Sequence, residues 1–292
     1  METSRLRFIR SLASHFHPGT EGSLYRYLSE EERRELEREG QSSQRATLLP
    51  RLRSAKAQLS KLHYSWLVAP LELLPRSLQF STATSLPEEM HKPLLMALGY
   101  KGAGRRAAPL AQLWLQRALF SSVGLDQVVP IEEVADSPLK ELCGWSKQEL
   151  VELVDLLALR DLVPFLRQIV DKEHLQTIYR LLSKEQRTYL RLLFHRQEKR
   201  VAPPLTMNDW HHSAKRLMHR LHLRGLMRLG RALAGSEQRW LVWHLTHLLD
   251  KGRGEVVARQ WEVAGERDQV GELLYQQLIE VSQYLGNRRR EL

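Results

Sequence analysis

The 292-residue chain has a single cysteine, Cys143, and this scarcity excludes several classes of protein. One thiol cannot build an internal disulfide framework, a cysteine-based zinc finger or an iron–sulfur site, and it suits a reducing cytosol. Long apolar runs are also lacking. The longest candidate, residues 150–159, is interrupted by Glu152 and Asp155 and falls short of the roughly 18 residues of a membrane span. Neither a disulfide-rich nor a membrane-spanning fold is expected.

Residues that favour strands are scarce as well. The sequence has 55 leucines but 5 isoleucines and 16 valines. Leucine loses little rotamer freedom in a helix, whereas β-branched side chains favour strands. The apolar share of 42% is enough to build a core and excludes a wholly disordered chain. The composition therefore predicts an all-α fold: a stacked array of short helices, armadillo-like or an irregular bundle, with no significant sheet.

Several helix starts can be read from capping residues. Ser29-x-x-Glu32, Ser146-x-x-Glu149 and Ser183-x-x-Gln186 have the spacing of a capping box. Pro87 opens a further segment that Gly99 closes. These signals place helix starts near residues 30, 147, 184 and 88.

Glycine and proline indicate where the chain divides. Residues 99–104 contain three glycines, and two consecutive prolines interrupt residues 201–204. We expect an N-terminal helical region over 1–100 and a C-terminal helical domain over 105–292 that contains the basic segment 187–231.

Motifs of known enzymes are absent. The chain has no nucleophile elbow, Walker loop, dinucleotide fingerprint or HExxH sequence. We therefore predict that it is not an enzyme and has no cofactor. Cys143 follows a leucine and has no basic neighbour in sequence, so we expect a buried, inert thiol.

Two histidine pairs deserve a separate interpretation. His219/His222 and His244/His247 each have the i, i+3 spacing that places two imidazoles on one helix face. A four-histidine metal site is one interpretation. Packing, with the polar ring atoms bonded to carbonyl groups, is the favoured one, so no metal site is predicted. The second pair belongs to a predicted core helix that begins near Trp240 and ends at Gly252 or Gly254.

The first nineteen residues alternate Arg5, Arg7 and Arg10 with apolar side chains. This composition suits a docked first helix, which we prefer, but also a transit-type presequence or a membrane-surface anchor. A secretory signal peptide is not expected, because the segment has no apolar stretch with a small-residue cleavage site.

Net positive charge is concentrated in one segment. The chain carries a net charge of +10, and residues 187–231 contribute eleven basic and two acidic residues, so they hold nine of those charges. At 100° per residue, five arginines of this segment fall within about 120° of a helix circumference. They are Arg216, Arg220, Arg224, Arg228 and Arg231. The pattern predicts a guanidinium stripe facing solvent, with Gly225 as a point where one helix can end at a helix–turn–helix corner.

Three interpretations of this stripe remain open. It can be an ordinary solvated face, a docking surface for an acidic protein partner, or a nucleic-acid-binding surface. Basic and aromatic residues are not interleaved as in single-strand-binding platforms, which disfavours nucleic acid. Docking of an acidic partner is the function that we favour. The alternative function is a helical nucleic-acid-binding protein that uses the same stripe.

Two segments resemble known families. Residues 63–75 (HYSWLVAPLELLP), followed by Leu86-Pro87-Glu88-Glu89, resemble the short armadillo-like units of flagellar switch proteins of the FliG type. Residues 224–233 (RGLMRLGRAL), followed by 240–254, are similar to the C-terminal part of the sorting-platform accessory proteins of type III secretion, the SctK/YscK type. The two resemblances cover residues 60–100 and 180–255.

The resemblance to sorting-platform accessory proteins implies a function. It indicates a cytosolic adaptor that connects the membrane ring to the pod, or C-ring, subunit of the sorting platform at the cytoplasmic face of the inner membrane. The family's binding residues do not map onto individual positions of this chain. The charge pattern instead supplies the expected docking residues. They are the five arginines of the stripe, which we expect to contact an acidic partner surface.

Overall fold

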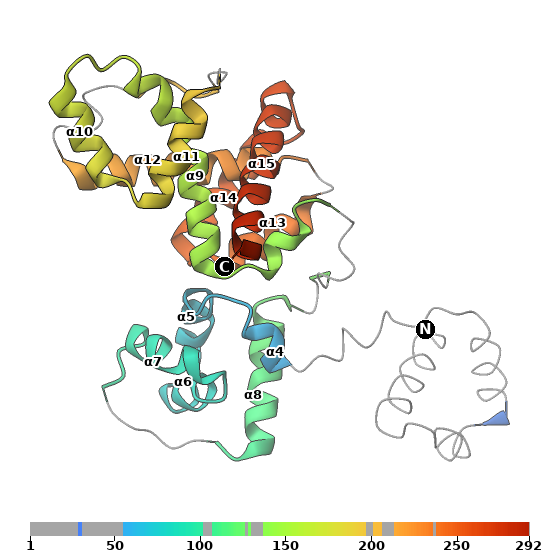
Figure 1. The fold of residues 1–292 in the computed structure, drawn as a ribbon. Coiled ribbons are helices and arrows are strands. Elements are labelled where there is room, and N and C mark those ends of the chain that lie inside the picture. Colours follow the sequence, from blue (N-terminus) through green and yellow to red (C-terminus); the bar gives the residue numbers. More distant parts are fainter. Residues whose placement is uncertain are drawn as a thin grey trace. The chain divides into compact units, whose positions relative to one another are not determined.

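The computed structural model divides into two compact units, residues 1–58 and 59–292. It describes residues 29–30, 55–101, 107–125, 128–129, 137–196, 201–205, 213–235 and 238–291 (Figure 1). The boundary expected at residues 101–104 does not coincide with the division after residue 58. The interpretations of residues 1–19 and of the Ser29-x-x-Glu32 capping box lie outside the described residues.

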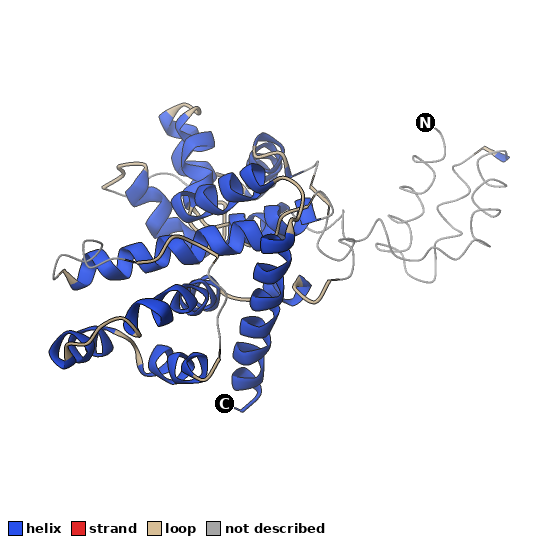
Figure 2. Ribbon diagram, turned by 90° about the horizontal axis from the view of Figure 1, so that it is seen from above, coloured by secondary structure: helices blue, strands red, loops and turns tan. Residues whose placement is uncertain are grey.

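The predicted all-α fold is confirmed. Every described residue lies in a helix, a turn or a loop, and the described ranges contain no strand (Figure 2). The helices are α4 (Ala55–Leu59), α5 (Ser65–Glu72), α6 (Arg76–Ala83), α7 (Glu88–Ala97), α8 (Pro109–Ser122), the 3-10 helix η3 (Lys140–Gly144), α9 (Lys147–Leu166), α10 (Lys172–Leu181), α11 (Lys184–Phe194), α12 (Ala214–Ala232), α13 (Arg239–Leu248), α14 (Lys251–Ala264) and α15 (Gln269–Glu291).

Capping signals in the sequence located helix starts correctly where they can be checked. Ser146 and Glu149 form a reciprocal capping box at the start of α9, and Ser183 and Gln186 form one at the start of α11. Helix α7 begins directly after Pro87. Each box satisfies backbone N–H groups that the first helical turn leaves without a partner.

Helices α5 to α8 form one packed group. Helix α6 packs against α5, α7 and α8. Leu67, Phe80, Leu94 and Leu119 are buried and supply one core side chain from each of the four helices. The regular apolar spacing within each short helix therefore builds a small core of its own.

Helices α9 to α15 pack around α9 and α12. Helix α9 contacts α11, α12 and α15, and α12 contacts α14 and α15 as well. Thirteen residues of α9 are buried, so this helix has little surface left for solvent. Leu226 and Leu229 of α12 and its C-cap residue Leu233 are buried there.

The expectation that α12 could end at Gly225 was wrong. The helix runs without interruption from Ala214 to Ala232. A Cβ atom on Gly225 would lie 2.1 Å from the backbone oxygen of Val154 on α9, and one on Gly230 would lie 2.5 Å from the backbone oxygen of Val257 on α14. These two glycines allow close approach of neighbouring helix backbones rather than a turn.

Gly252 and Gly254 were likewise expected to end the helix that begins near Trp240. Instead, α13 ends at Leu248, and both glycines lie inside α14, whose N-terminus Asp250 caps. A Cβ on Gly254 would lie 2.4 Å from the backbone oxygen of Thr246, so this glycine also marks a close approach.

Replacing Gly225 with alanine is expected to destabilise the fold by about 1–3 kcal/mol, because the added methyl group meets a backbone oxygen that cannot rotate away. Gly286 of α15 is the matched control. A Cβ there would meet no atom within 4 Å, so Gly286→Ala should stabilise the fold by up to about 1 kcal/mol through helix propensity. Urea unfolding of both variants measures the difference, and stabilisation by both would contradict the close packing of α12 on α9.

Candidate partner-binding surface

One continuous helix carries all five arginines of the predicted stripe. Ser213 caps α12, and its hydroxyl accepts a hydrogen bond from the backbone N–H of Arg216. The five side chains nevertheless occupy different environments. Arg228 is buried, Arg224 and Arg231 are half-buried, and Arg216 and Arg220 are exposed.

Arg228 is the clearest exception to the predicted stripe. Its side chain is 5% exposed, and it forms a two-point ion pair with Asp161 of α9, with Nε 3.1 Å from Oδ2 and Nη2 2.5 Å from Oδ1. Its Nη1 donates to Gln277 Oε1 at 2.8 Å. The expectation that Arg228 faces solvent was wrong, because α9, α14 and α15 cover this half of α12 on several sides.

Arg224 and Arg231 also have partners within the chain. Arg224 is half-buried, donates to the carbonyl oxygen of Pro203 at 2.7 Å, and lies 3.7 Å from Asp161 Oδ2. Arg231 forms an ion pair with Asp268 at 2.9 Å. The charge of the C-terminal half of α12 is thus largely balanced within the molecule.

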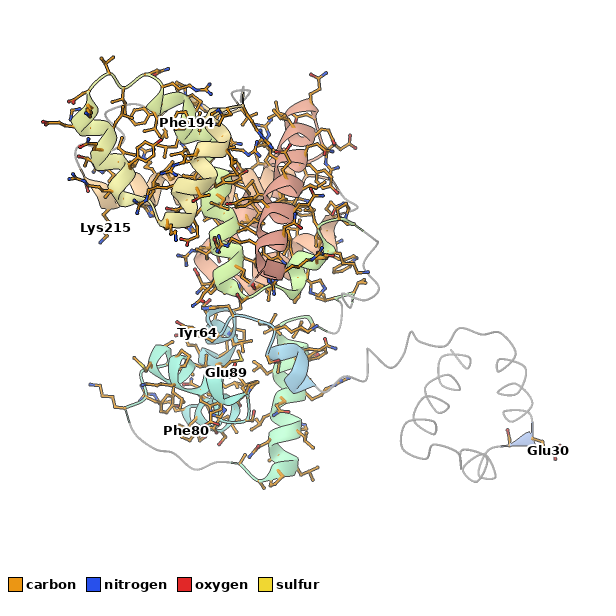
Figure 3. All side chains as sticks on the ribbon, in the orientation of Figure 1. Glu30, Tyr64, Phe80, Glu89, Phe194 and Lys215 are labelled. Atoms are coloured by element: carbon orange, nitrogen blue, oxygen red, sulfur yellow. The ribbon has the colours of Figure 1, made fainter. Side chains whose placement is uncertain are left out.

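The N-terminal half of α12 presents its charge to solvent. Lys215, Arg216 and Arg220 are all exposed, together with His219. Lys215 lies at the outer edge of its helix group in Figure 3. No aspartate or glutamate occurs in the sequence from residue 210 to 236. We call Lys215, Arg216 and Arg220 the outer basic surface.

The two histidine pairs lie in different surroundings. No group of three potential ligands within binding distance occurs among the described residues. His219 is exposed, whereas His222 contacts Asp155 and Arg253. His244 lies 3.0 Å from the carbonyl oxygen of Val129. His244 therefore fits the packing interpretation, whereas His219 is not packed and His222 bonds to charged side chains rather than to a carbonyl group.

His222 is part of a polar network that the sequence did not indicate. Arg253 Nε donates to His222 Nε2 at 2.8 Å, so the imidazole proton lies on Nδ1 and is donated to Asp155 Oδ1 at 2.7 Å. Arg253 also pairs with Asp250, and Lys147 Nζ lies 3.3 Å from Asp250 Oδ2. The chain of contacts therefore ties α9, α12 and α14 together.

The same network reaches the segment before α5. Lys147 Nζ lies 3.0 Å from His63 Nε2, and Ser65 Oγ lies 2.9 Å from His63 Nδ1. Burial, followed by the Lys147 charge, lowers the pKa of His63. Burial alone would raise the pKa of Asp250, but hydrogen bonds from Arg253 outweigh it and lower the pKa to about 2.

An aromatic stack lies beside this network. The His247 ring is stacked between Trp66 and Trp243, with ring centroids 4.2 Å and 4.0 Å apart. Its Nδ1 donates to the carbonyl oxygen of Trp243 at 2.7 Å. Burial lowers the pKa of His247 to about 4. His247 is therefore a neutral packing residue, joined to α5 by Trp66.

The single thiol is not a reactive group. Cys143 is half-buried, and burial raises its pKa to about 12. A thiolate is the nucleophilic form of cysteine. Cys143 thus stays protonated near neutral pH, as the sequence interpretation of an inert thiol requires.

Comparison with known proteins adds no assignment: no protein family, curated protein or solved structure matches the chain. No helix in the described part of the chain is long and apolar enough to cross a membrane.

Sequence reasoning found the basic segment but not its division. The signals for the division are Asp161 and Asp268, which lie 67 and 37 residues from their arginine partners. Periodicity within α12 cannot identify partners at such distances, because it reports only which residues share a helix face.

Proposed function

We propose that the chain is a non-enzymatic helical adaptor that docks an acidic surface of a partner protein through Lys215, Arg216 and Arg220. The observation that carries this proposal is the split of the stripe. Arg228 is buried against Asp161, whereas the outer basic surface is exposed on a stretch of sequence without acidic residues.

The chemistry of the outer basic surface suits carboxylates. A guanidinium group presents a planar set of donors that matches a carboxylate with two parallel hydrogen bonds. The three residues are close in sequence on one helix, so a partner helix or loop with clustered aspartate or glutamate can meet all of them. Such contacts steer association and weaken as salt screens them.

The sequence resemblance supplies the biological setting of the proposal. The segments that resemble SctK/YscK-type proteins are residues 224–233 and 240–254. The first of them contains Arg228, which is buried in the core. We propose that this chain is an adaptor subunit of a type III secretion apparatus, at the cytoplasmic face of the inner membrane. Its partners would be the cytosolic domain of the membrane ring and the pod, or C-ring, subunit.

Affinity purification of the full chain from cells that express it tests this function. At low salt, mass spectrometry should recover ring or pod components of the secretion apparatus, and moderate salt should release them. Recovery of none of these components at low salt would contradict the proposal.

A fluorescence titration with duplex and single-stranded oligonucleotides distinguishes the adaptor function from the alternative, a nucleic-acid-binding function. The adaptor proposal expects no binding at low salt. Tight binding that is lost in a Lys215→Glu/Arg216→Glu/Arg220→Glu variant would assign the surface to nucleic acid, because phosphate contacts dominate such affinity.

A further inference from the structure

Helix α8 carries an apolar ridge that the proposed function does not use. Leu110, Leu113 and Trp114 have the i, i+3, i+4 spacing of one helix face, and they are 80%, 60% and 66% exposed. The opposite face of the helix is buried in the α5–α8 group through Leu115, Gln116, Leu119 and Phe120. We call Leu110, Leu113 and Trp114 the α8 ridge.

Burial of the far face shows that α8 is a packed element of the fold. The helix contacts α6 and α5, and Gln116 Nε2 donates a hydrogen bond to the carbonyl oxygen of Ser85. Pro109 occupies its first turn, where a fixed φ angle favours helix initiation. The ridge thus lies on a rigid support in the first two turns of the helix.

The sequence segment that contains the ridge is basic. From residue 90 to 125 the sequence has no aspartate or glutamate and five basic residues. Three of the five are described, and Lys92, Lys101 and Arg117 are all exposed. Arg117 lies three residues beyond Trp114 on the same helix, with its guanidinium carbon 5.5 Å from the Phe120 ring centroid. An exposed cation beside an apolar ridge favours a ligand that is both apolar and anionic.

We propose that the α8 ridge inserts into the surface of an anionic lipid bilayer. Tryptophan and leucine partition into the boundary between headgroups and acyl chains, and basic side chains beside them are attracted to anionic headgroups. The ridge projects from a convex helix face, which a bilayer accommodates directly, whereas a partner helix would have to supply a groove. The positive charges lie on different segments and do not follow a helical repeat. An anionic bilayer surface does not require a fixed spacing of charges, so it can attract all of them.

Sedimentation with vesicles tests this proposal on the full chain. Vesicles of phosphatidylcholine with phosphatidylserine should bind the protein at least about tenfold more tightly than vesicles of phosphatidylcholine alone. Leu110→Ser/Leu113→Ser/Trp114→Ser should lose at least about tenfold in affinity for the anionic vesicles, because it removes three large apolar side chains.

A second triple variant provides the matched control. Val170, Leu192 and Val263 are exposed apolar residues on other elements of the chain. Val170→Ser/Leu192→Ser/Val263→Ser should bind anionic vesicles as the wild type does. Absence of wild-type binding to these vesicles, or equal binding by the ridge variant and the wild type, would overturn the proposal. Equal binding would place the lipid contact elsewhere in the chain.

Tryptophan fluorescence locates the contact without loss of the apolar surface. Vesicles with brominated acyl chains quench only indoles that reach the chains, and Trp114 should account for most of the quenching. Trp114→Phe should bind as the wild type does but lose most of that quenching. Unchanged quenching in this variant would overturn insertion of the ridge. The lipid test does not depend on the outer basic surface of α12, so either proposal can fail alone.

Discussion

Replacing Asp161 with alanine is expected to destabilise the fold by about 3–5 kcal/mol, the typical cost of removing one partner of a buried ion pair. The carboxylate accepts two hydrogen bonds from Arg228, and both residues are buried. Without it, Arg228 keeps Gln277 as a neutral partner and remains a buried cation. Chemical denaturation followed by circular dichroism measures this loss.

A double variant distinguishes an unpaired charge from a loss of packing. Asp161→Leu/Arg228→Met replaces the ion pair with apolar side chains and should recover most of the stability that Asp161→Leu alone removes. Arg231→Met, in a partly exposed ion pair, is the control. Its partner Asp268 is 56% exposed, so it should cost no more than about 1 kcal/mol. Equal losses for Asp161→Ala and Arg231→Met would contradict a buried ion pair in the core.

Acidification from about pH 6.5 to pH 4 is expected to destabilise the fold by about 3 kcal/mol through His247 alone. Its pKa is lowered to about 4 in the folded chain. Between the two pKa values the unfolded chain binds a proton that the folded chain does not, so stability rises with pH across this range. Asp250, with a pKa lowered to about 2, contributes at pH values below this range.

Substitution of His247 by phenylalanine tests the assignment. The phenyl ring preserves the stack between Trp66 and Trp243 but does not titrate, so the variant should lose most of the pH dependence between pH 4 and 6.5. His63 retains a smaller contribution of the same sign, because its pKa is also lowered. His219→Phe, at an exposed position, is the control and should keep the wild-type profile. An unchanged profile for His247→Phe would contradict a neutral, buried imidazole in the stack.

Sequence reasoning succeeded where the signal is local. The excess of leucine predicted helices because helix propensity is a property of each residue. The capping boxes at Ser146 and Ser183 predicted two helix starts because each box lies within one turn. The same reasoning failed at Gly225. Glycine is favoured both at a helix end and where two helices approach closely, so the residue type alone does not distinguish them. The choice between them depends on Val154, 71 positions earlier in the chain.

The candidate site shows the same limit. A helical projection placed the five arginines on one side of α12 correctly, but it could not tell how many neighbouring helices cover that side. Arg228 is buried because α9 supplies Asp161, and Arg216 is exposed because it lies near the start of the helix. The aromatic stack around His247 requires Trp66 from α5, which no spacing in α13 reveals.

The division of the stripe is tested most directly by partner retention in a charge-reversal variant, Lys215→Glu/Arg216→Glu/Arg220→Glu. The control, Lys184→Glu/Arg187→Glu/Arg259→Glu, changes the net charge equally at exposed positions on α11 and α14. The free energy of unfolding of both variants should lie within about 1 kcal/mol of the wild-type value, as is usual for substitutions at exposed sites. The outer variant should lose the salt-sensitive partner in affinity purification while the control retains it. Retention of that partner by the folded outer variant would contradict the account.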